Sequence, residues 1–216
     1  MLFLLAPAHG RTSGTRILSG TTACAEAFQG EHLTPAETAH AFLRRVTSPW
    51  HQTTEDAFAC FDVATLEGAR AFLRAQSRAV LPLEADIGAR GILEFVPDWP
   101  SRMRGDALCQ DLQTLKTQPA EPLPVILMSQ LQALGALYVL EGSRLGGALL
   151  HRRAMDSRVP AVRDATGFFG HKAGPQGWRR FLTILNTAGR DNPALLELQI
   201  GAETAFALFG KAARGA

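Results

Sequence analysis

One segment of the chain combines a carboxylate, a hydroxyl and three glycines at helical spacing: Glu141-Gly142-Ser143-Arg144-Leu145-Gly146-Gly147. It lies inside a long helical pattern, where each glycine costs about 0.5–1 kcal/mol relative to alanine. Gly142 and Gly146 are four residues apart and Gly147 is adjacent, so they expose one strip of helix backbone. Something must approach that strip closely. Either a second helix packs against the small residues, or a flat ligand lies on bare backbone.

A histidine with a carboxylate one turn away is the second candidate for chemistry. His51 is followed by Glu55 at i+4, so both side chains share one helical face. A metal-bound histidine usually donates its other ring N–H to a carboxylate, a carbonyl or water, and Glu55 could accept it. The alternative is an ordinary surface His–Glu pair. Arg44 lies about two turns before His51, where a cation could neutralise a ligand carboxylate, unless it belongs to a solvated basic face.

Two rival arrangements involve His40. It is nearly in phase with His51 and is a rival metal ligand, but no carboxylate follows it four residues later. Glu37-Thr38-Ala39-His40 also matches the Glu-x-x-His pattern of di-iron helical bundles. Such a bundle needs two copies, and the chain has no second one. A site built on one histidine is therefore favoured.

The elements that carry these residues are predicted to be helices. Apolar residues recur with a 3.6-residue period and period-two alternation is nearly absent, so the chain is predicted to be all-α. Pro49 either kinks the first helix or starts a new one capped by Thr47 or Ser48. The longest pattern, residues 125–155, carries the glycines. The other patterns start at Thr34-Pro35, after the Thr65 cap, after the Trp99-Pro100 turn, near Pro175 and at Asn192-Pro193.

Composition fits one compact domain. The chain has 216 residues, 46% hydrophobic and 19% charged, which suits a folded domain with a sizeable core. Residues 1–30, rich in Gly, Thr, Ser and Ala, are predicted to be a poorly ordered N-terminal extension, and residues 31–216 to form the domain. Three cysteines without a C-x-x-C pair argue against a disulfide scaffold or zinc ribbon and fit a cytoplasmic protein. Lys and Arg are scattered and the net charge is only +2, so no nucleic-acid partner is expected. The chain has no uninterrupted apolar run of about 20 residues, so no membrane insertion is expected either.

Several segments resemble one family in the same order along the chain. Leu137 to Gly147 closely resembles the distal-helix motif of bacterial heme oxygenases, most of all the branch that often accompanies bacteriophytochromes. Thr47 to His51 followed by Glu55 resembles the family's proximal segment, and Asp98–Arg102 and Gly177–Leu182 are also similar. The resemblance covers residues 34–213. It implies a multi-helix bundle that holds heme between a proximal and a distal helix.

The resemblance also implies roles for single residues. His51 would be the proximal ligand of the heme iron, with Glu55 as its hydrogen-bond partner, and Gly142, Gly146 and Gly147 would be the distal glycines. Ser143 stands where better-known members carry an aspartate that organises distal water. Tyr138 is one position out of register with a propionate-binding tyrosine. The candidates for holding the heme propionates are therefore Arg44, Tyr138, Arg179 and Arg180.

The implied activity is oxidative cleavage of heme to biliverdin, carbon monoxide and free iron, with heme as both cofactor and substrate. Oxygen and an electron donor such as ferredoxin or a flavoprotein reductase would be partners, with a bilin-accepting phytochrome as a further one. A neutral imidazole pushes less electron density than a thiolate, and bare glycine supplies no acid, so neither promotes O–O cleavage at the iron. Two alternatives remain: a non-catalytic heme carrier or sensor with the same fold, and a helical enzyme acting on a small heterocycle, which would need a cysteine or carboxylate in its pocket.

Overall fold

The computed structural model describes residues 37–171 and 174–215, and within these residues every regular element is a helix. The predicted all-α fold is confirmed, whereas the predicted N-terminal extension lies outside the described residues. The three longest helices are α3 (Leu66–Ala89), α6 (Gln130–Met155) and α10 (Asn192–Arg214). The shorter ones are α1 (Ala39–Val46), α2 (Ser48–Phe58), η1 (Ile92–Glu94), α4 (Trp99–Arg102), α5 (Gly105–Thr114), α7 (Pro160–Asp164), α8 (Gly167–Gly170) and α9 (Gly174–Ala188).

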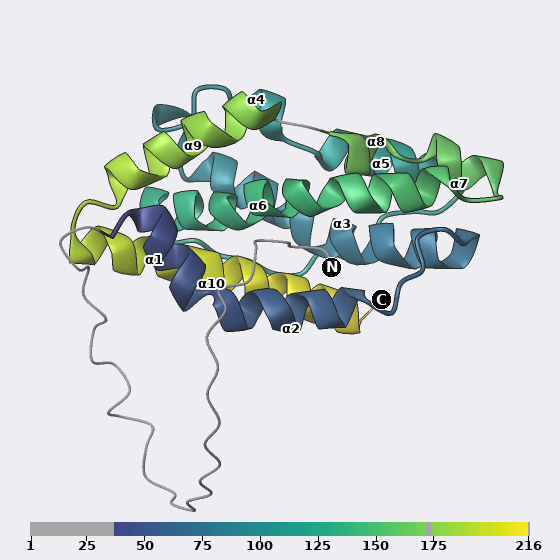
Figure 1. Ribbon diagram of the computed structural model, residues 1–216, viewed down its shortest axis with the longest axis horizontal. Helices are drawn as coiled ribbons and strands as arrows, with labels where there is room; N and C mark the ends of the chain where they lie inside the picture. Colours follow the sequence, from purple (N-terminus) through teal and green to yellow (C-terminus); the bar gives the residue numbers. More distant parts are fainter. Residues whose placement is uncertain (1–36, 172–173, 216) are drawn as a thin grey trace, which may run out of the picture.

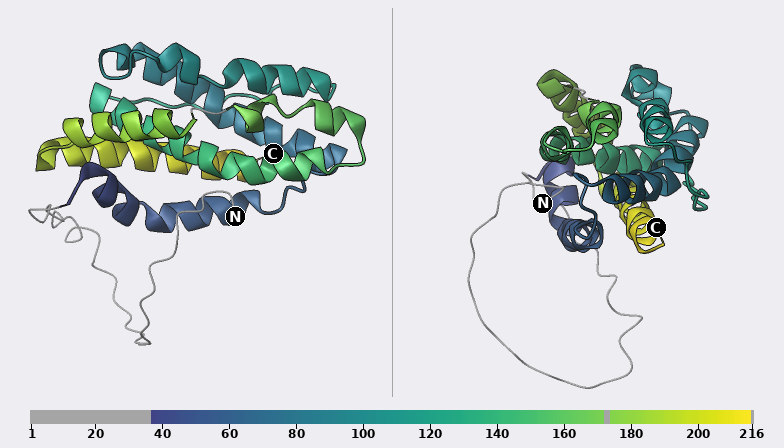
Figure 2. Two further views of the ribbon diagram at one scale, coloured as in Figure 1. Left: turned by 45° about the horizontal axis from the view of Figure 1, so that its top comes forward. Right: turned by 90° about the vertical axis from the view of Figure 1, so that its right-hand side faces the viewer.

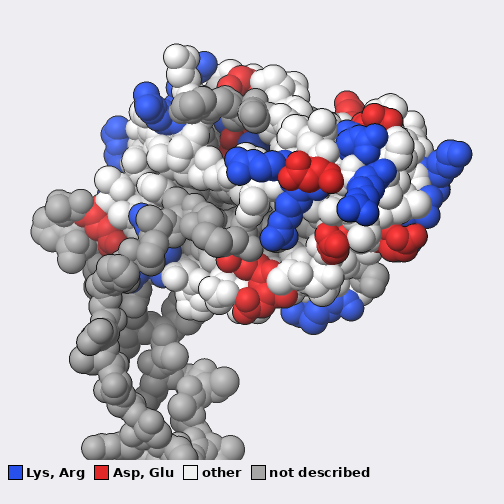
Figure 3. Space-filling model, turned by 45° about the vertical axis from the view of Figure 1, so that its right-hand side comes forward, with Lys and Arg blue, Asp and Glu red and all other residues white. Residues whose placement is uncertain are grey.

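Helix α6 runs through the middle of the molecule (Figure 1). Helices α3 and α10 both pack against it, and α1 and α2 lie along α10 as an outer layer (Figures 1 and 2). Figure 3 shows Lys and Arg interspersed with Asp and Glu on the face that it presents. In the described part of the chain, no helix combines the length and the apolar composition that a membrane span needs.

Polar side chains at the helix starts set the boundaries. Thr65 and Ser129 cap α3 and α6, because their hydroxyls accept backbone N–H groups of the first turn. The sequence pattern predicted that the longest helix begins at Val125. It begins at Gln130 instead, because Ser129 caps it there. The prediction for the last helix was wrong by one residue, since the Asp191 carboxylate caps α10 in place of Asn192.

The start of the first helix was also predicted wrongly. Helix α1 begins at Ala39, and the Thr38 hydroxyl accepts the Ala41 N–H at 3.2 Å. Glu37 therefore precedes the helix, and its carboxylate pairs with Arg45 at 3.2 Å. The Glu-x-x-His pattern at Glu37 does not lie on one helix, which removes the geometry that a di-iron bundle requires. Among the described residues, no group of three or more His, Cys, Asp or Glu is placed to hold a metal ion.

Helices α1 and α2 are separate, which decides between a kinked and a new helix. Thr47 is buried between them, and its hydroxyl donates to the Leu43 carbonyl at 2.7 Å. Its side chain consequently makes no capping bond to α2. Pro49 lies in the first turn of α2, where the missing N–H would be unsatisfied in any case. His51 is thus carried on a helix of its own.

A close crossing of α6 and α10 organises the core. A Cβ added to Gly135 would overlap the Leu198 carbonyl, and one added to Gly201 would overlap the Gln132 carbonyl. The two helices touch backbone to backbone there, and only glycine fits. Residues 132–141 of α6 are buried on every side, because α3 and α10 both cover this helix. The crossing fixes α6 about two turns before the glycine motif.

Candidate active site

His51 lies on α2 with its ring against α10. The imidazole meets the Phe206 ring edge-on, with ring centroids 4.5 Å apart. Burial and the nearby Arg44 guanidinium lower the pKa of His51 to about 4. The ring is therefore neutral at physiological pH, which is the form in which imidazole binds a metal ion. Glu55 lies one turn further along the same face of α2.

Arg44 lies in the last turn of α1, close to its junction with α2. Besides burial, its charge lowers the pKa of His40 as well as that of His51. It also acts on Tyr138 of α6, although burial dominates there and raises the pKa of that phenol to about 12. Tyr138 is four residues before Gly142 and shares its face of α6. The Gly142 face of the central helix therefore adjoins the junction that carries Arg44 and His51.

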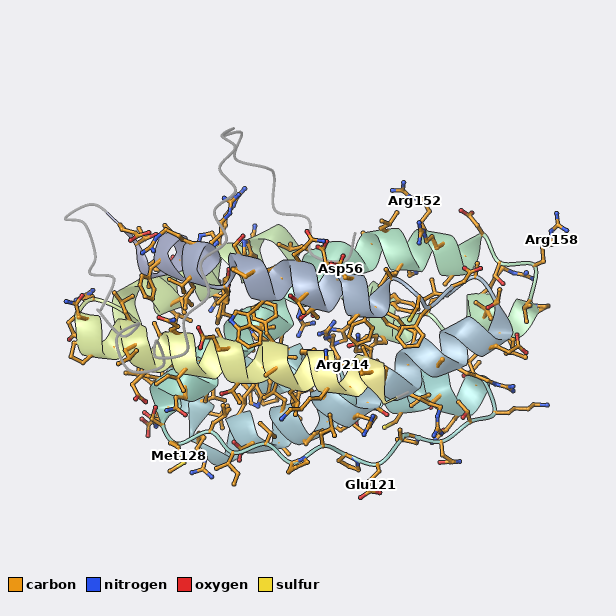
Figure 4. All side chains as sticks on the ribbon, turned by 90° about the horizontal axis from the view of Figure 1, so that it is seen from below. Asp56, Glu121, Met128, Arg152, Arg158 and Arg214 are labelled. Atoms are coloured by element: carbon orange, nitrogen blue, oxygen red, sulfur yellow. The ribbon has the colours of Figure 1, made fainter. Side chains whose placement is uncertain are left out.

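A small cavity lies among α2, α3, α6, α8 and α10. Its volume is about 20 Å³, enough for one water molecule. Phe58 of α2 lines it, two turns after His51 and on the same face, together with Ser143 and Gly147 of α6. Helix α10 contributes Phe209, and Figure 4 shows side chains filling the space between α2 and α10. The cavity therefore brings the Phe58 end of α2 close to Ser143 and Gly147 of α6.

The glycines of α6 have different surroundings. A Cβ added to Gly142 would meet no described atom within 4 Å, so this backbone faces open space. A Cβ added to Gly147 would lie 3.0 Å from the Phe169 carbonyl oxygen, because α8 packs on that side. Gly146 is buried between them in the helix. Each interpretation of the motif thus applies to a different residue: Gly147 permits helix packing, whereas Gly142 leaves room for a ligand.

Glu141 fixes the motif in a buried ion network. Its carboxylate is 1% exposed and accepts from Arg102 Nη1 and Arg144 Nε, each at 3.0 Å. Arg102 also pairs with Asp98 at 2.9 Å, and Arg144 Nη1 lies 2.7 Å from His171 Nδ1. The carboxylate of the motif is therefore held between two arginines and is not among the groups that line the cavity.

A second buried arginine holds Ser143. Arg104 Nη2 donates to Ser143 Oγ at 2.7 Å, and this hydroxyl donates to the Leu140 carbonyl at 2.7 Å. The Glu84 carboxylate accepts the backbone N–H groups of Arg104 and Gly105 at 2.7 and 3.0 Å, which fixes the start of α5. Burial, with the Arg144 charge, lowers the pKa of Arg104 to about 9, so the guanidinium stays charged at neutral pH.

The other predicted residues divide into two groups. Tyr138 is buried with its ring centroid 6.1 Å from that of His40 and 6.3 Å from that of Trp178. Arg179 and Arg180 are exposed on α9. The pKa of Asp98 is lowered first by the Arg102 hydrogen bond, and the Arg180 charge adds to this. Arg44 therefore lies near His51 and Tyr138 near His40, whereas Arg180 lies near the Asp98 turn.

Sequence reasoning missed Arg104, Glu84 and the partners of Glu141. One signal was present: Glu84 falls on the apolar face of its helix, beside Leu83 and Ile87, where an unpaired carboxylate would be costly. The sequence around Arg104 gives no comparable signal, because Arg104 lies in a turn and not on an apolar helix face. Its hydrogen-bond partners come from α3 and α6.

Comparisons with known proteins show which sequences this chain resembles. The family model described as heme oxygenase matches residues 121–214. A heme oxygenase of Xanthomonas campestris is 34% identical over 112 residues, which cover 51% of this chain and 67% of the relative. The heme oxygenase PigA of Pseudomonas aeruginosa is 30% identical over 179 residues, which cover 78% of this chain and 87% of the relative.

A solved structure shares the fold. It is the heme oxygenase of Neisseria meningitidis in its NO- and CO-bound forms, with a TM-score of 0.66 and 24% identity, covering 83% of this chain and 92% of that one. The sequence likeness to two relatives, which the matches cover to 67% and 87% of their own lengths, decides the family. The chain belongs to the heme oxygenase family.

Proposed function

We propose that this chain binds heme between α2 and α6 and cleaves it with oxygen to biliverdin, carbon monoxide and free iron. Family membership supports the activity. The observation that carries the site is the open backbone at Gly142, which lies on the face of α6 that adjoins Arg44 and the neutral imidazole of His51. A ligand placed there would contact bare backbone on one side and a nitrogen donor on the other.

Bound heme supplies an iron atom that binds oxygen and a porphyrin that is itself cleaved. His51 would hold the iron through a ring nitrogen, and Glu55 would accept the other ring N–H directly or through water. Arg44 would pair with a propionate, with the Tyr138 hydroxyl beside it. Gly142, Gly146 and Gly147 would allow α6 to lie against the porphyrin, since none carries a side chain.

The absence of a cavity acid favours attack on the ring. No carboxylate is among the described side chains that line the cavity, and Glu141 is held by Arg102 and Arg144. A strong proton donor next to bound oxygen would promote O–O cleavage at the iron, as would a thiolate ligand. His51 and the glycine-rich wall of α6 would supply neither, which would favour reaction at the porphyrin edge over O–O cleavage at the iron.

Heme binding requires the two helices to separate. The cavity of about 20 Å³ is far smaller than a porphyrin. Helices α1 and α2 form an outer layer whose packing is mainly on α10 and α9, whereas α6 is fixed by its backbone crossing with α10. We infer that the α1–α2 layer moves outward on heme binding and that α6 stays in place.

The finer assignments are part of the same proposal. The chain would take electrons from an external donor such as ferredoxin or a flavoprotein reductase, and would act in the cytoplasm. The likeness of Leu137–Gly147 to the bacteriophytochrome-associated branch supports a bilin-accepting phytochrome as the recipient of the product.

Two histidine variants test the ligand assignment. His51→Ala should lose the ligand-field spectrum of a nitrogen-ligated heme, as well as most turnover. His40→Ala is the matched control, because His40 is also a half-buried histidine near Arg44 with a lowered pKa. It should keep both. Retention of the wild-type spectrum in His51→Ala would show that another group ligates the iron.

A further inference from the structure

We propose that Arg104, Ser143 and Gln76 hold an ordered water molecule beside the glycine motif of α6, and that Arg104 positions this water to carry a proton to the ligand site. The inference rests on the proposed function for its purpose but not for its geometry. It assigns a role to a buried cation that neither the family likeness nor the motif identified.

Arg104 is a buried guanidinium with a donor left over. It is 4% exposed, and its Nη2 donates to Ser143 Oγ at 2.7 Å and to the Leu140 carbonyl at 3.3 Å. The central carbon of the Arg104 guanidinium, Cζ, lies over the Phe168 ring, 4.6 Å from the ring centroid, in a cation–π contact. Among the described residues, its Nε–H meets no acceptor. A buried charged donor without an acceptor is costly, so a small acceptor is expected next to it.

The cavity that Arg104 lines has the size and polarity for that acceptor. A buried water needs about 10–15 Å³ and two to four polar partners, and the volume here is about 20 Å³. Most of the wall is aromatic. Its polar side chains are Arg104, Ser143 and Gln76, of which Gln76 is itself 7% exposed. They offer a cationic donor, a hydroxyl and an amide.

The charge of Arg104 orients a water bound there. A water that accepts from a guanidinium turns its lone pairs toward the cation and its O–H bonds away from it. Ser143, which the same guanidinium holds, follows Gly142 directly, so the proposed water would lie one residue along α6 from the open backbone. The chain thereby supplies a weak proton donor on this side although its motif has no free carboxylate.

The experiment compares the C–O stretching frequency of the ferrous carbon monoxide complex in the wild type, Arg104→Met and Ser143→Ala. A hydrogen-bond donor near bound carbon monoxide lowers this frequency, so both substitutions should raise it. Arg70→Met is the matched control, because Arg70 is a half-buried arginine that bonds the Leu115 carbonyl, does not line the cavity and lies outside the Glu141 network. It should leave the frequency unchanged. Wild-type frequencies in Arg104→Met and Ser143→Ala, or an equal shift in Arg70→Met, would overturn the inference.

A second measurement does not depend on heme. A high-resolution crystal structure of the heme-free chain should show a water within hydrogen-bond distance of Arg104 Nε and of Ser143 or Gln76. It should be lost in Arg104→Met, and Arg104→Lys, which keeps the charge, should retain it at least in part. A dry cavity in the wild type would refute the site even if hemin binds. Failure of hemin to bind, with the water present, would refute only the proposed function.

Discussion

Replacing Glu141 with glutamine tests the ion network that fixes the distal motif. The substitution preserves shape but removes the negative charge between Arg102 and Arg144, whose nitrogens lie 3.0 Å from the carboxylate oxygens. Because the carboxylate is 1% exposed, water cannot replace it. Removing one partner of a buried ion pair typically costs about 3–5 kcal/mol. For a domain of this size, that lowers Tm by roughly 10 °C.

The assay is urea unfolding of the heme-free chain, with thermal melting alongside. Glu37→Gln is the matched control, since it also breaks a Glu–Arg pair, but one whose arginine side chain is 44% exposed. An exposed pair contributes about 0–1 kcal/mol, so this variant should unfold close to the wild type. If Glu141→Gln were as stable as Glu37→Gln, the network would not stabilise α6 and the account of the motif's anchorage would be wrong.

Two further predictions follow from the same helix. Gly135→Ala should lower the free energy of unfolding by about 3 kcal/mol, because its Cβ would overlap the Leu198 carbonyl. Gly142→Ala, whose Cβ would meet open space, should raise the free energy of unfolding by about 0.5–1 kcal/mol in the heme-free chain. Parallel urea titrations compare the two variants. Equal destabilisation of both would contradict the packing described. Tyr138, the only tyrosine of the chain, should titrate near 12 in the folded state and near 10 in urea, as followed by phenolate absorbance. The pKa of Tyr138 is higher in the folded than in the unfolded chain, so its burial stabilises the fold fully below pH 10 and progressively less as pH rises from 10 to 12. A titration midpoint near 10 in the folded chain would show that the phenol is exposed.

The helical fold could be predicted because its determinants are local. Apolar periodicity identified the longer helices but not η1, α7 or α8. Thr65 marks the start of α3 through a hydrogen bond within one turn. The errors arose where several residues compete for the same role. At the last helix, Asp191 and Asn192 are adjacent and both suit an N-cap, and the sequence alone did not rank them.

The candidate site could be predicted only in part. His51 and the glycines are identifiable from residue type and spacing. Gly147 packs against α8, whereas Gly142 faces open space. This difference depends on α8, which is twenty or more residues away in the chain and was not predicted. The pairing of Arg104 with Ser143 is likewise a contact between distant segments. Nothing in either local sequence specifies it.

The most direct test of the proposed function is the fate of bound heme. Hemin added to the purified chain should give the spectrum of a histidine-ligated complex. Reductant in air should then bleach its Soret band, with formation of a green bilin and of carbon monoxide trapped by reduced myoglobin. Biliverdin and carbon monoxide in equal amounts, one of each per heme lost, are the result expected. Heme that stays intact after prolonged reduction in air would identify a carrier or sensor and contradict the proposed enzyme.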